Sequence, residues 1–511
     1  MKFPGVPRPR PEHAGEEEEE GAPVGVAQRA QRARGSLRRQ FPVAPDLSRA
    51  IDAPTVRDNM LPVVTGPQVA DDALVLRVLD LALRVGEVQL ATGAGAAVAH
   101  DTMLAIARAY GLPTCDVDIA FSTITICCHR GNEAGPVTTM RNVRYRTQDY
   151  TRLTEVDDLI TAVVDHDDPL PVEEATTRLG NAVRANHPYP RFVAGIARSL
   201  FAGAVAVLIG GGLLVAVLAA VATGIVWGAA RWLGRRNVPL FFQQMVGAAI
   251  VTLSATTLAW SGVLEDSPVF VIAAGIVVLL SGLSLVGLVQ DAITGFPLTA
   301  AGRAVEVVLS SAGLLVGVVV SIKLVNAVLG TDAVAYAAVV PPGPSPSLDP
   351  LSLVAAAGAG MLFALSAYAP WRSLPFAALA GATAWGSYAA LGIAGAGEVV
   401  AAALAAAALG LVAMLLPRTL GTPPLVLVIA GITPLLPGLT LYRGFSQLAY
   451  NSVAQSAVTI LLALTFGLAL AAGVSVGEQV GWPLQRLIRR LLPGAAEDRA
   501  RDARRGRPRV F

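Results

Sequence analysis

The carboxy-terminal part of this chain contains few charged residues, and it is much longer than a single membrane span. Residues 192–483 contain 17 charged residues among 292, whereas the preceding 190 residues carry most of the charge. A transmembrane helix needs about 20 apolar residues, and about a quarter of the residues of a soluble domain are charged. The pattern predicts a multi-pass α-helical membrane protein and excludes an ordinary cytosolic enzyme, a disordered protein and a disulfide-rich secreted module.

Breaks in the apolar sequence divide it into ten expected transmembrane helices. The first two share residues 192–231 and are separated by Gly210-Gly211-Gly212. The other eight are expected at 241–263, 268–289, 303–323, 351–369, 374–391, 398–416, 423–441 and 450–474. No signal peptide is expected, because the first 40 residues lack an apolar core.

The loops on the two sides of the expected spans differ in charge, with most arginines on one side and most acidic residues on the other. With the amino terminus inside, the inner loops carry Arg231, Arg235, Arg236, Arg303, Arg372 and Arg418. The outer side carries Lys323 and Arg443, together with Glu265, Asp266, Asp332, Asp349 and Glu398. This distribution follows the positive-inside rule and predicts an inner (plasma) membrane protein with both termini in the cytoplasm.

A short motif occurs twice within the apolar region. Leu279–Leu285 (LLSGLSL) resembles Leu435–Leu441 (LLPGLTL), and each copy lies in the fourth span of a five-span half. An odd number of spans gives the two halves opposite orientations, and inverted repeats are typical of secondary transporters. We expect helix breaks at Ser281-Gly282 and at Pro437-Gly438 that free backbone groups for a solute. A chance match in a biased sequence is the alternative.

The polar part is expected to hold a tail and one small α+β domain. Ten prolines and no periodicity predict disorder in residues 1–68. Helical periodicity follows from Asp71, alternating segments near 115–121, 123–127 and 137–143 predict a small antiparallel sheet, and two more helices follow. The expected divisions are a tail (1–68), a cytoplasmic domain (69–190), a five-span unit (191–330), a Pro-rich outer loop (331–349), a second five-span unit (350–480) and a basic cytoplasmic tail (481–511).

Asp291 and Arg303 are the first candidates for a substrate or proton pathway. An acid near the membrane core is costly to ionise and is a functional candidate by default. Asp291 is suited to take up a proton or bind an ammonium group, and Arg303 to face a carboxylate. In the alternative interpretation both lie in an inner loop and pair with each other or with headgroups.

Uncharged amides form a second candidate group. Gln447, Asn451 and Gln455 have the spacing i, i+4, i+8 and would share one face of the last span. Such amides either line a solute path or join helices by hydrogen bonds, a common use in membrane bundles.

The polar domain also contains thiols and imidazoles that suggest an enzyme. His100-Asp101, Cys127-Cys128-His129, Asp116 and Asp118 supply nucleophile, base and carboxylate types. The sequence has no nucleophile elbow, and Cys127-Cys128-His129 is too compressed for a tetrahedral zinc site. Packing roles are therefore favoured, no metal or cofactor is expected, and the unpaired cysteine count fits a reducing compartment.

Together these motifs resemble the threonine/serine exporter family. The resemblance rests on Val85-Gly86-Glu87, Ala91–Gly95, Tyr110-Gly111-Leu112 and Cys128–Gly131 in the polar domain. It also rests on Leu280–Leu283, Asp291, Gly302-Arg303 and Pro434–Leu439 in the membrane part, and it covers about residues 71–475. The chain departs from the family where Ser281 stands in place of the usual proline.

The resemblance implies export of threonine and serine driven by the proton motive force. We therefore expect a transporter that exchanges small amino acids for protons, with the substrate bound near the two helix breaks and Asp291 as the coupling acid. Expected partners are threonine, serine, protons and membrane lipids, with no nucleic acid, and the oligomeric state stays open. The alternatives are a membrane-tethered enzyme of the hydrolase type, to which the family's polar domain has been likened, and a passive channel.

Overall fold

The computed structural model describes most of the chain from residue 71 to residue 491. The described residues are 71–130, 135–143, 148–164, 169–264, 268–279, 282–329, 347–415, 424–437, short pieces between 440 and 447, and 452–491. The predictions for the tail 1–68, for most of the outer loop 331–349, for residues 492–511 and for Ser281, Gly438 and Asn451 concern residues outside these ranges.

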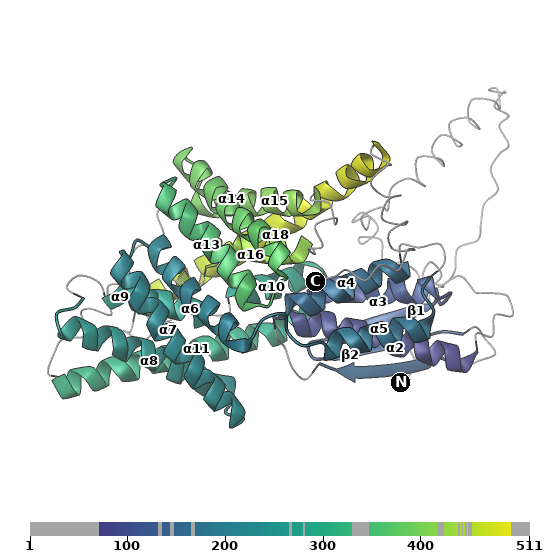
Figure 1. Ribbon diagram of the computed structural model, residues 1–511, viewed down its shortest axis with the longest axis horizontal. Helices are drawn as coiled ribbons and strands as arrows, with labels where there is room; N and C mark the ends of the chain where they lie inside the picture. The colour runs from purple at the N-terminus through teal and green to yellow at the C-terminus, as the bar shows by residue number, and fades with distance from the viewer. Residues whose placement is uncertain are drawn as a thin grey trace, which may run out of the picture. The chain divides into compact units, whose positions relative to one another are not determined.

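The amino-terminal domain consists of four helices and a three-stranded sheet (Figure 1). Its elements are α2 (Asp72–Thr92), α3 (Ala96–Ala109), β1 (Cys115–Ala120), β2 (Thr123–Cys128), β3 (Val137–Asn142), α4 (Tyr150–Val164) and α5 (Val172–Arg184). The Asp71 carboxylate accepts the Ala73 N–H at the start of α2, and Gly93, at φ 104°, ends this helix in the left-handed conformation that glycine tolerates.

The sheet is antiparallel in the order β1-β2-β3, as the alternating pattern predicts. Cys115 lies opposite Cys128 and Ile119 opposite Ile124. In β2, Ile124, Ile126 and Cys128 are buried, while the residues between them are half-buried. The buried face joins α2, α3, α4 and α5 in a hydrophobic core separate from that of the membrane helices.

The first group of membrane helices packs through glycines. Its members are α6 (Arg191–Leu208), α7 (Leu213–Arg235), α8 (Leu240–Trp260), α9 (Pro268–Leu279), α10 (Gly282–Ile293) and α11 (Pro297–Leu329). Gly313 and Gly317 of α11 lie so close to the backbone oxygens of Phe241 and Met245 in α8 that a side chain at either position would collide. Small residues four apart allow such close approach of helices in membranes.

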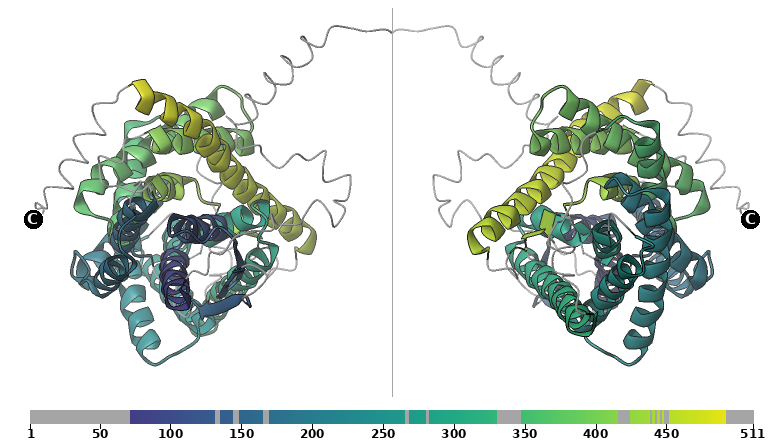
Figure 2. Two further views of the ribbon diagram at one scale, coloured as in Figure 1. Left: turned by 90° about the vertical axis from the view of Figure 1, so that its right-hand side faces the viewer. Right: turned by 90° about the vertical axis from the view of Figure 1, so that its left-hand side faces the viewer.

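The second group repeats this mode of packing. It consists of α13 (Pro350–Ser366), η2 (Trp371–Ser373), α14 (Leu374–Ile393), α15 (Glu398–Leu415), α16 (Pro424–Ile432), η4 (Thr433–Leu435) and α18 (Val453–Leu491). Gly473 and Gly477 of α18 approach the backbone oxygens of Ala403 and Ala407 in α15. Figure 2 shows α18 as one long helix that crosses this group.

Seven described helices are long and apolar enough to cross a membrane. The pair α9 and α10, inclined by 46°, makes an eighth span if it crosses as one unit. The apolar helices at Pro350–Ser366 and Pro424–Leu435 are shorter. Each of the ten expected spans thus coincides with a helix or helix pair, and the structure is that of a multi-pass membrane protein. The number ten and the inverted orientation of the halves stay predictions.

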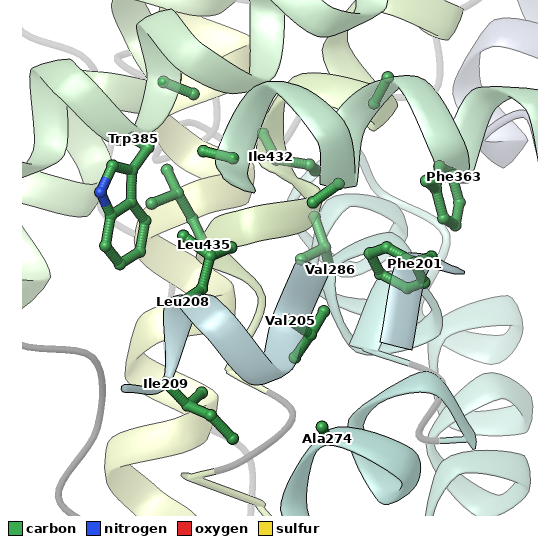
Figure 3. Packing of buried hydrophobic residues seen from close by; sticks show 14 of the residues in the cluster. Phe201, Val205, Leu208, Ile209, Ala274, Val286, Phe363, Trp385, Ile432 and Leu435 are labelled. Atoms are coloured by element: carbon green, nitrogen blue, oxygen red, sulfur yellow. The ribbon is translucent and has the colours of Figure 1, made fainter. Parts of the chain in front are cut away.

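The buried core joins the two groups of helices. Phe201, Val205 and Leu208 of α6 lie in one hydrophobic cluster with Phe363 of α13 and Ile432 of α16 (Figure 3). The rings of Phe201 and Phe363 meet edge to face with centroids 5.9 Å apart. In addition, α6 packs on α13 and α10 packs on α18. Contacts between groups therefore involve helices near the two repeated motifs.

Candidate functional site

A cavity of about 630 Å³ lies where the amino-terminal domain meets both groups of membrane helices. Thr92, Gly93 and Gly95 contribute from the turn between α2 and α3. Further lining residues come from α6, α7, α10 and α11 of the first group and from α13, α16 and α18 of the second. A volume of several hundred Å³ is the size of pockets that hold small molecules.

The walls of this cavity carry two positive and two negative side chains. Among its lining residues the charged ones are Arg198 of α6, Arg303 and Glu306 of α11, and Glu478 of α18. Arg198 and Glu306 are exposed, Glu478 is half-buried and Arg303 is buried. The balance of charge suits a small molecule that bears both signs and no net charge.

Arg303 is held on the cavity wall by Asp291 and by the amino-terminal domain. Arg303 Nη1 lies 3.1 Å from Asp291 Oδ2, and Arg303 Nη2 donates to the Ala94 carbonyl oxygen at 3.3 Å. The Asp291 side chain is fully buried, and its Oδ1 accepts the Ala96 N–H at 2.9 Å. The expected pairing of Asp291 with Arg303 is thus present, and its surroundings are the α2–α3 turn and the first residue of α3.

Asp291 acts as the amino-terminal cap of a helix that begins 195 residues earlier in the chain. Gly95, at the N-cap position of α3, has no side chain to accept the free N–H groups of the first turn. The Asp291 carboxylate supplies that acceptor, and its negative charge meets the positive end of the helix dipole. A side-chain carbon at Gly95 would lie 3.5 Å from Asp291 Oδ1, which is an ordinary van der Waals contact.

The start of α11 is joined to the β1–β2 hairpin next to this ion pair. Thr299 Oγ1 accepts the Phe121 N–H at 3.0 Å and donates to the Ile119 carbonyl oxygen at 3.0 Å. The Phe121 ring lies against Gly302, where any side chain would overlap it. Phe296, between α10 and α11, packs against the core of the amino-terminal domain. We call the contacts of residues 291–303 with this domain the first junction.

A second junction connects the amino-terminal domain to the segment that follows α13. The Tyr150 N–H donates to the Ala367 carbonyl oxygen at 2.9 Å, and the Thr151 hydroxyl donates to the Tyr368 carbonyl oxygen. The His187 ring stacks on Tyr368 with centroids 4.2 Å apart, and its Nδ1 lies 3.0 Å from the buried Asp149 carboxylate. The amino-terminal domain therefore contacts both groups of membrane helices.

The other predicted site residues are distributed as follows. Gly282 is the first residue of α10, the preceding helix α9 ends at Leu279, and the two helices are inclined by 46°. Pro437 is a buried turn residue that follows η4 at the second motif. α10 and α16, the helices next to these breaks, both line the cavity.

The expectation that Gln447 shares a helix face with Gln455 is wrong. α18 begins at Val453, and Gln447 lies before it. The Gln447 side-chain oxygen accepts a hydrogen bond from the Thr459 hydroxyl at 2.7 Å, while Gln455 is exposed. The i, i+4 spacing predicted one continuous helix, but Ser452, directly before α18, is not helical.

The thiols and imidazoles of the amino-terminal domain lie in separate pairs. His129 Nε2 is 3.4 Å from Asp116 Oδ2, and His100 Nδ1 is 3.0 Å from Asp101 Oδ1. Burial and the neighbouring Cys128 raise the pKa of the Cys115 thiol far above its usual value, which keeps it protonated and unreactive. Among the described residues, no group of three or more His, Cys, Asp and Glu side chains is placed to hold a metal ion.

Sequence reasoning did not identify Glu306, Glu478 or Arg198 as site residues. Glu478 lies beyond residue 474, where the last span was expected to end, but α18 continues to Leu491. Arg198 lies within residues 192–231, the segment expected to hold the first two spans, and was not among the candidates. A charged residue within a helix that is otherwise apolar is the signal that could have identified all three residues.

Comparison with known proteins identifies the relatives of the chain. Residues 80–325 match the family model described as putative threonine/serine exporter, and residues 351–480 match the model described as threonine/serine exporter, ThrE. A probable threonine/serine exporter of Mycobacterium tuberculosis is 39% identical over 81% of this chain and 78% of its own length. A threonine/serine exporter of Corynebacterium glutamicum is 36% identical over 81% of this chain and 85% of its own. No solved structure matches the chain. The chain belongs to the threonine/serine exporter family, and it is a transporter rather than an enzyme.

Proposed function

We propose that this protein exports threonine and serine across the plasma membrane in exchange for protons, and that the cavity is the site where the amino acid binds. The names of its relatives support an amino acid exporter. The observation that carries the site is the cavity itself, whose walls combine the amino-terminal domain, both helix groups and charges of both signs.

The location of the cavity fits a substrate site of the transporter type. Secondary transporters bind their substrates between repeated halves, next to interrupted helices. Here α10 begins in the first repeated motif and supplies Ser284 and Gly287 to the walls, and α16 ends just before the second motif and supplies Ile429 and Ile432. The free ends of the two helix breaks would then face the bound zwitterion.

Proton exchange is assigned to Asp291. Its carboxylate has a basic partner, Arg303, and accepts the Ala96 N–H. Protonation would weaken both contacts and loosen the first junction beside the cavity. In this proposal, proton uptake at Asp291 is coupled to movement of the amino-terminal domain, which lies on the cytoplasmic side and covers the inner mouth of the cavity.

The direct test of the function measures efflux of labelled threonine and serine from loaded cells with and without the protein. Faster efflux that an uncoupler abolishes supports proton-driven export. Faster efflux that is unaffected by the uncoupler at the same solute gradient would instead show a passive channel. Equal efflux of both amino acids with and without the protein would contradict the substrate assignment.

The coupling role of Asp291 is tested by Asp291→Asn, which removes the charge and keeps an oxygen that can accept the Ala96 N–H. We expect slower export that no longer depends on pH. The matched control is Asp101→Asn, which changes an exposed acid of the amino-terminal domain and should leave export unchanged. A wild-type rate with unchanged pH dependence in Asp291→Asn would exclude the proton-carrier role.

A further inference from the structure

Two opposite charges in the cavity form no ion pair and no hydrogen bond among the described residues. Arg303 is paired with Asp291, and Glu306 also interacts with a neighbour. For Arg198 and Glu478, the described part of the chain provides neither an ion pair nor a hydrogen bond, although both line the cavity. Glu478 is half-buried, and a charge withdrawn from bulk water is costly unless it is paired. Arg198 is exposed, so its guanidinium is accessible to a molecule that enters the cavity.

The two charges belong to different groups of membrane helices. Arg198 is on α6, which packs on α7 and α9 of its own group and on α13 of the other. Glu478 is on α18, which packs on α15 of its own group and on α10 of the other. A molecule that contacts both side chains therefore connects the two groups across the cavity.

We propose that Arg198 binds the carboxylate and Glu478 the ammonium group of the exported amino acid. This assignment deepens the proposed function and rests on it. A guanidinium binds a carboxylate through two parallel hydrogen bonds, and a carboxylate accepts hydrogen bonds from an ammonium group. With Arg303 and Glu306 the lining charges sum to zero, which matches a zwitterion and disfavours anionic or cationic amino acids.

Hydroxyl groups in the same walls would favour amino acids that carry a hydroxyl group. The Ser310 hydroxyl donates to the Val307 carbonyl oxygen at 3.1 Å, and the Ser366 hydroxyl donates to the Phe363 carbonyl oxygen at 2.8 Å. Because each hydrogen is already used, the two oxygens remain as acceptors for a hydroxyl hydrogen of the substrate. Val428 and Ile429 add an apolar surface beside them that suits the methyl group of threonine.

The test uses the full-length protein in proteoliposomes and three compounds that differ in one charge each. Threonine carries both groups, threoninol lacks the carboxylate, and 2,3-dihydroxybutanoate lacks the ammonium group. Each competes with labelled threonine for transport by the wild type, Arg198→Gln and Glu478→Gln. Loss of one charge-assisted contact is expected to raise the threonine concentration for half-maximal transport about tenfold or more.

The two substitutions should differ in which analogue they leave unaffected. In Arg198→Gln, threonine binds more weakly while threoninol competes as in the wild type. In Glu478→Gln, threonine binds more weakly while 2,3-dihydroxybutanoate competes as in the wild type. Arg198→Lys and Glu478→Asp, which keep the charge, should restore part of the affinity.

Control variants separate this assignment from general damage. Arg236→Gln changes the arginine that follows α7 and stacks on Trp232, and Glu398→Gln changes the first residue of α15. Neither of these residues lines the cavity, and both variants should transport as the wild type does. Wild-type threonine affinity in both Arg198→Gln and Glu478→Gln, or equal weakening of all three compounds, would overturn the assignment. A wild type that transports neither threonine nor serine would instead contradict the proposed function.

Discussion

Asp291 shows how one side chain can serve two distant parts of a chain. It lies in the last turn of α10, where a negative charge opposes the helix dipole. That unfavourable position is offset by Arg303 and by the amino-terminal end of α3. The pairing of Asp291 with Arg303, twelve positions later, could be predicted from the sequence. The contact with Ala96 could not, because it depends on how two separately folded parts meet.

The cysteines of the amino-terminal domain should differ in reactivity. Cys115 and Cys128 are buried and Cys127 is half-buried, and burial raises the pKa of the Cys115 thiol. Because the thiolate is the reactive form, we expect alkylation at neutral pH to modify Cys127 well before Cys115. Timed exposure of the folded protein to iodoacetamide, followed by mass spectrometry of sequenced peptides, measures the order.

Replacing Cys127 and Cys128 with serine gives the functional counterpart of that experiment. Export should persist, because the family consists of transporters and these thiols lie in the sheet of the amino-terminal domain.

In the labelling experiment, faster modification of Cys115 than of Cys127 would contradict the burial described above.

At the scale of elements, helix packing depends on glycines at contacts between backbones. Gly317 of α11 faces the Met245 carbonyl oxygen of α8, whereas nothing lies within 4 Å of a side-chain carbon placed at Gly228 of α7. The two glycines are both helical, so they differ mainly in this contact.

Gly317→Ala should therefore destabilise the protein, and Gly228→Ala should not. Overpacking a close contact costs about 1–3 kcal/mol, while alanine in an open helical position gains about 0.5–1 kcal/mol over glycine. Thermal unfolding in detergent should show a lower Tm for Gly317→Ala and an equal or higher Tm for Gly228→Ala. Equal shifts for the two variants would show that the helix contact is not limiting.

Most elements could be predicted from the sequence because apolar periodicity and glycine or proline breaks directly indicate helices and strands. The helices and the sheet of the amino-terminal domain lie where expected. The last span was expected to end at residue 474, because polar and charged residues become more frequent beyond it, but the helix continues past that point. α18 continues to Leu491, which places Glu478 in a helix rather than after it.

At the scale of the whole molecule, the amino-terminal domain shares a core residue and a helix cap with the first group of membrane helices. Phe296 packs against its hydrophobic core and Asp291 caps its α3. The two family models agree with this grouping, since one spans residues 80–325 and the other residues 351–480. The cavity, in contrast, requires all three parts, so its residues could not be assembled from local patterns.

Co-expressed fragments should therefore reassemble better when the chain is cut between the two helix groups than when it is cut before α6. Fragments 1–338 and 339–511 keep the first junction within one polypeptide, whereas fragments 1–190 and 191–511 separate Asp291 and Phe296 from the domain they complete. Threonine efflux from cells that carry each pair measures the difference. Equal or better export from the pair cut at residue 190 would contradict the grouping.

The capping of α3 by Asp291 has a consequence for observing transport. The Ala96 N–H is protected from solvent by a carboxylate of a membrane helix, so the lifetime of that hydrogen depends on where α10 stands. Under the proposed coupling, deuterium uptake at the start of α3 would report on a displacement of α10. The exchange rate of this single backbone amide would then measure how often the contact between Ala96 and Asp291 opens.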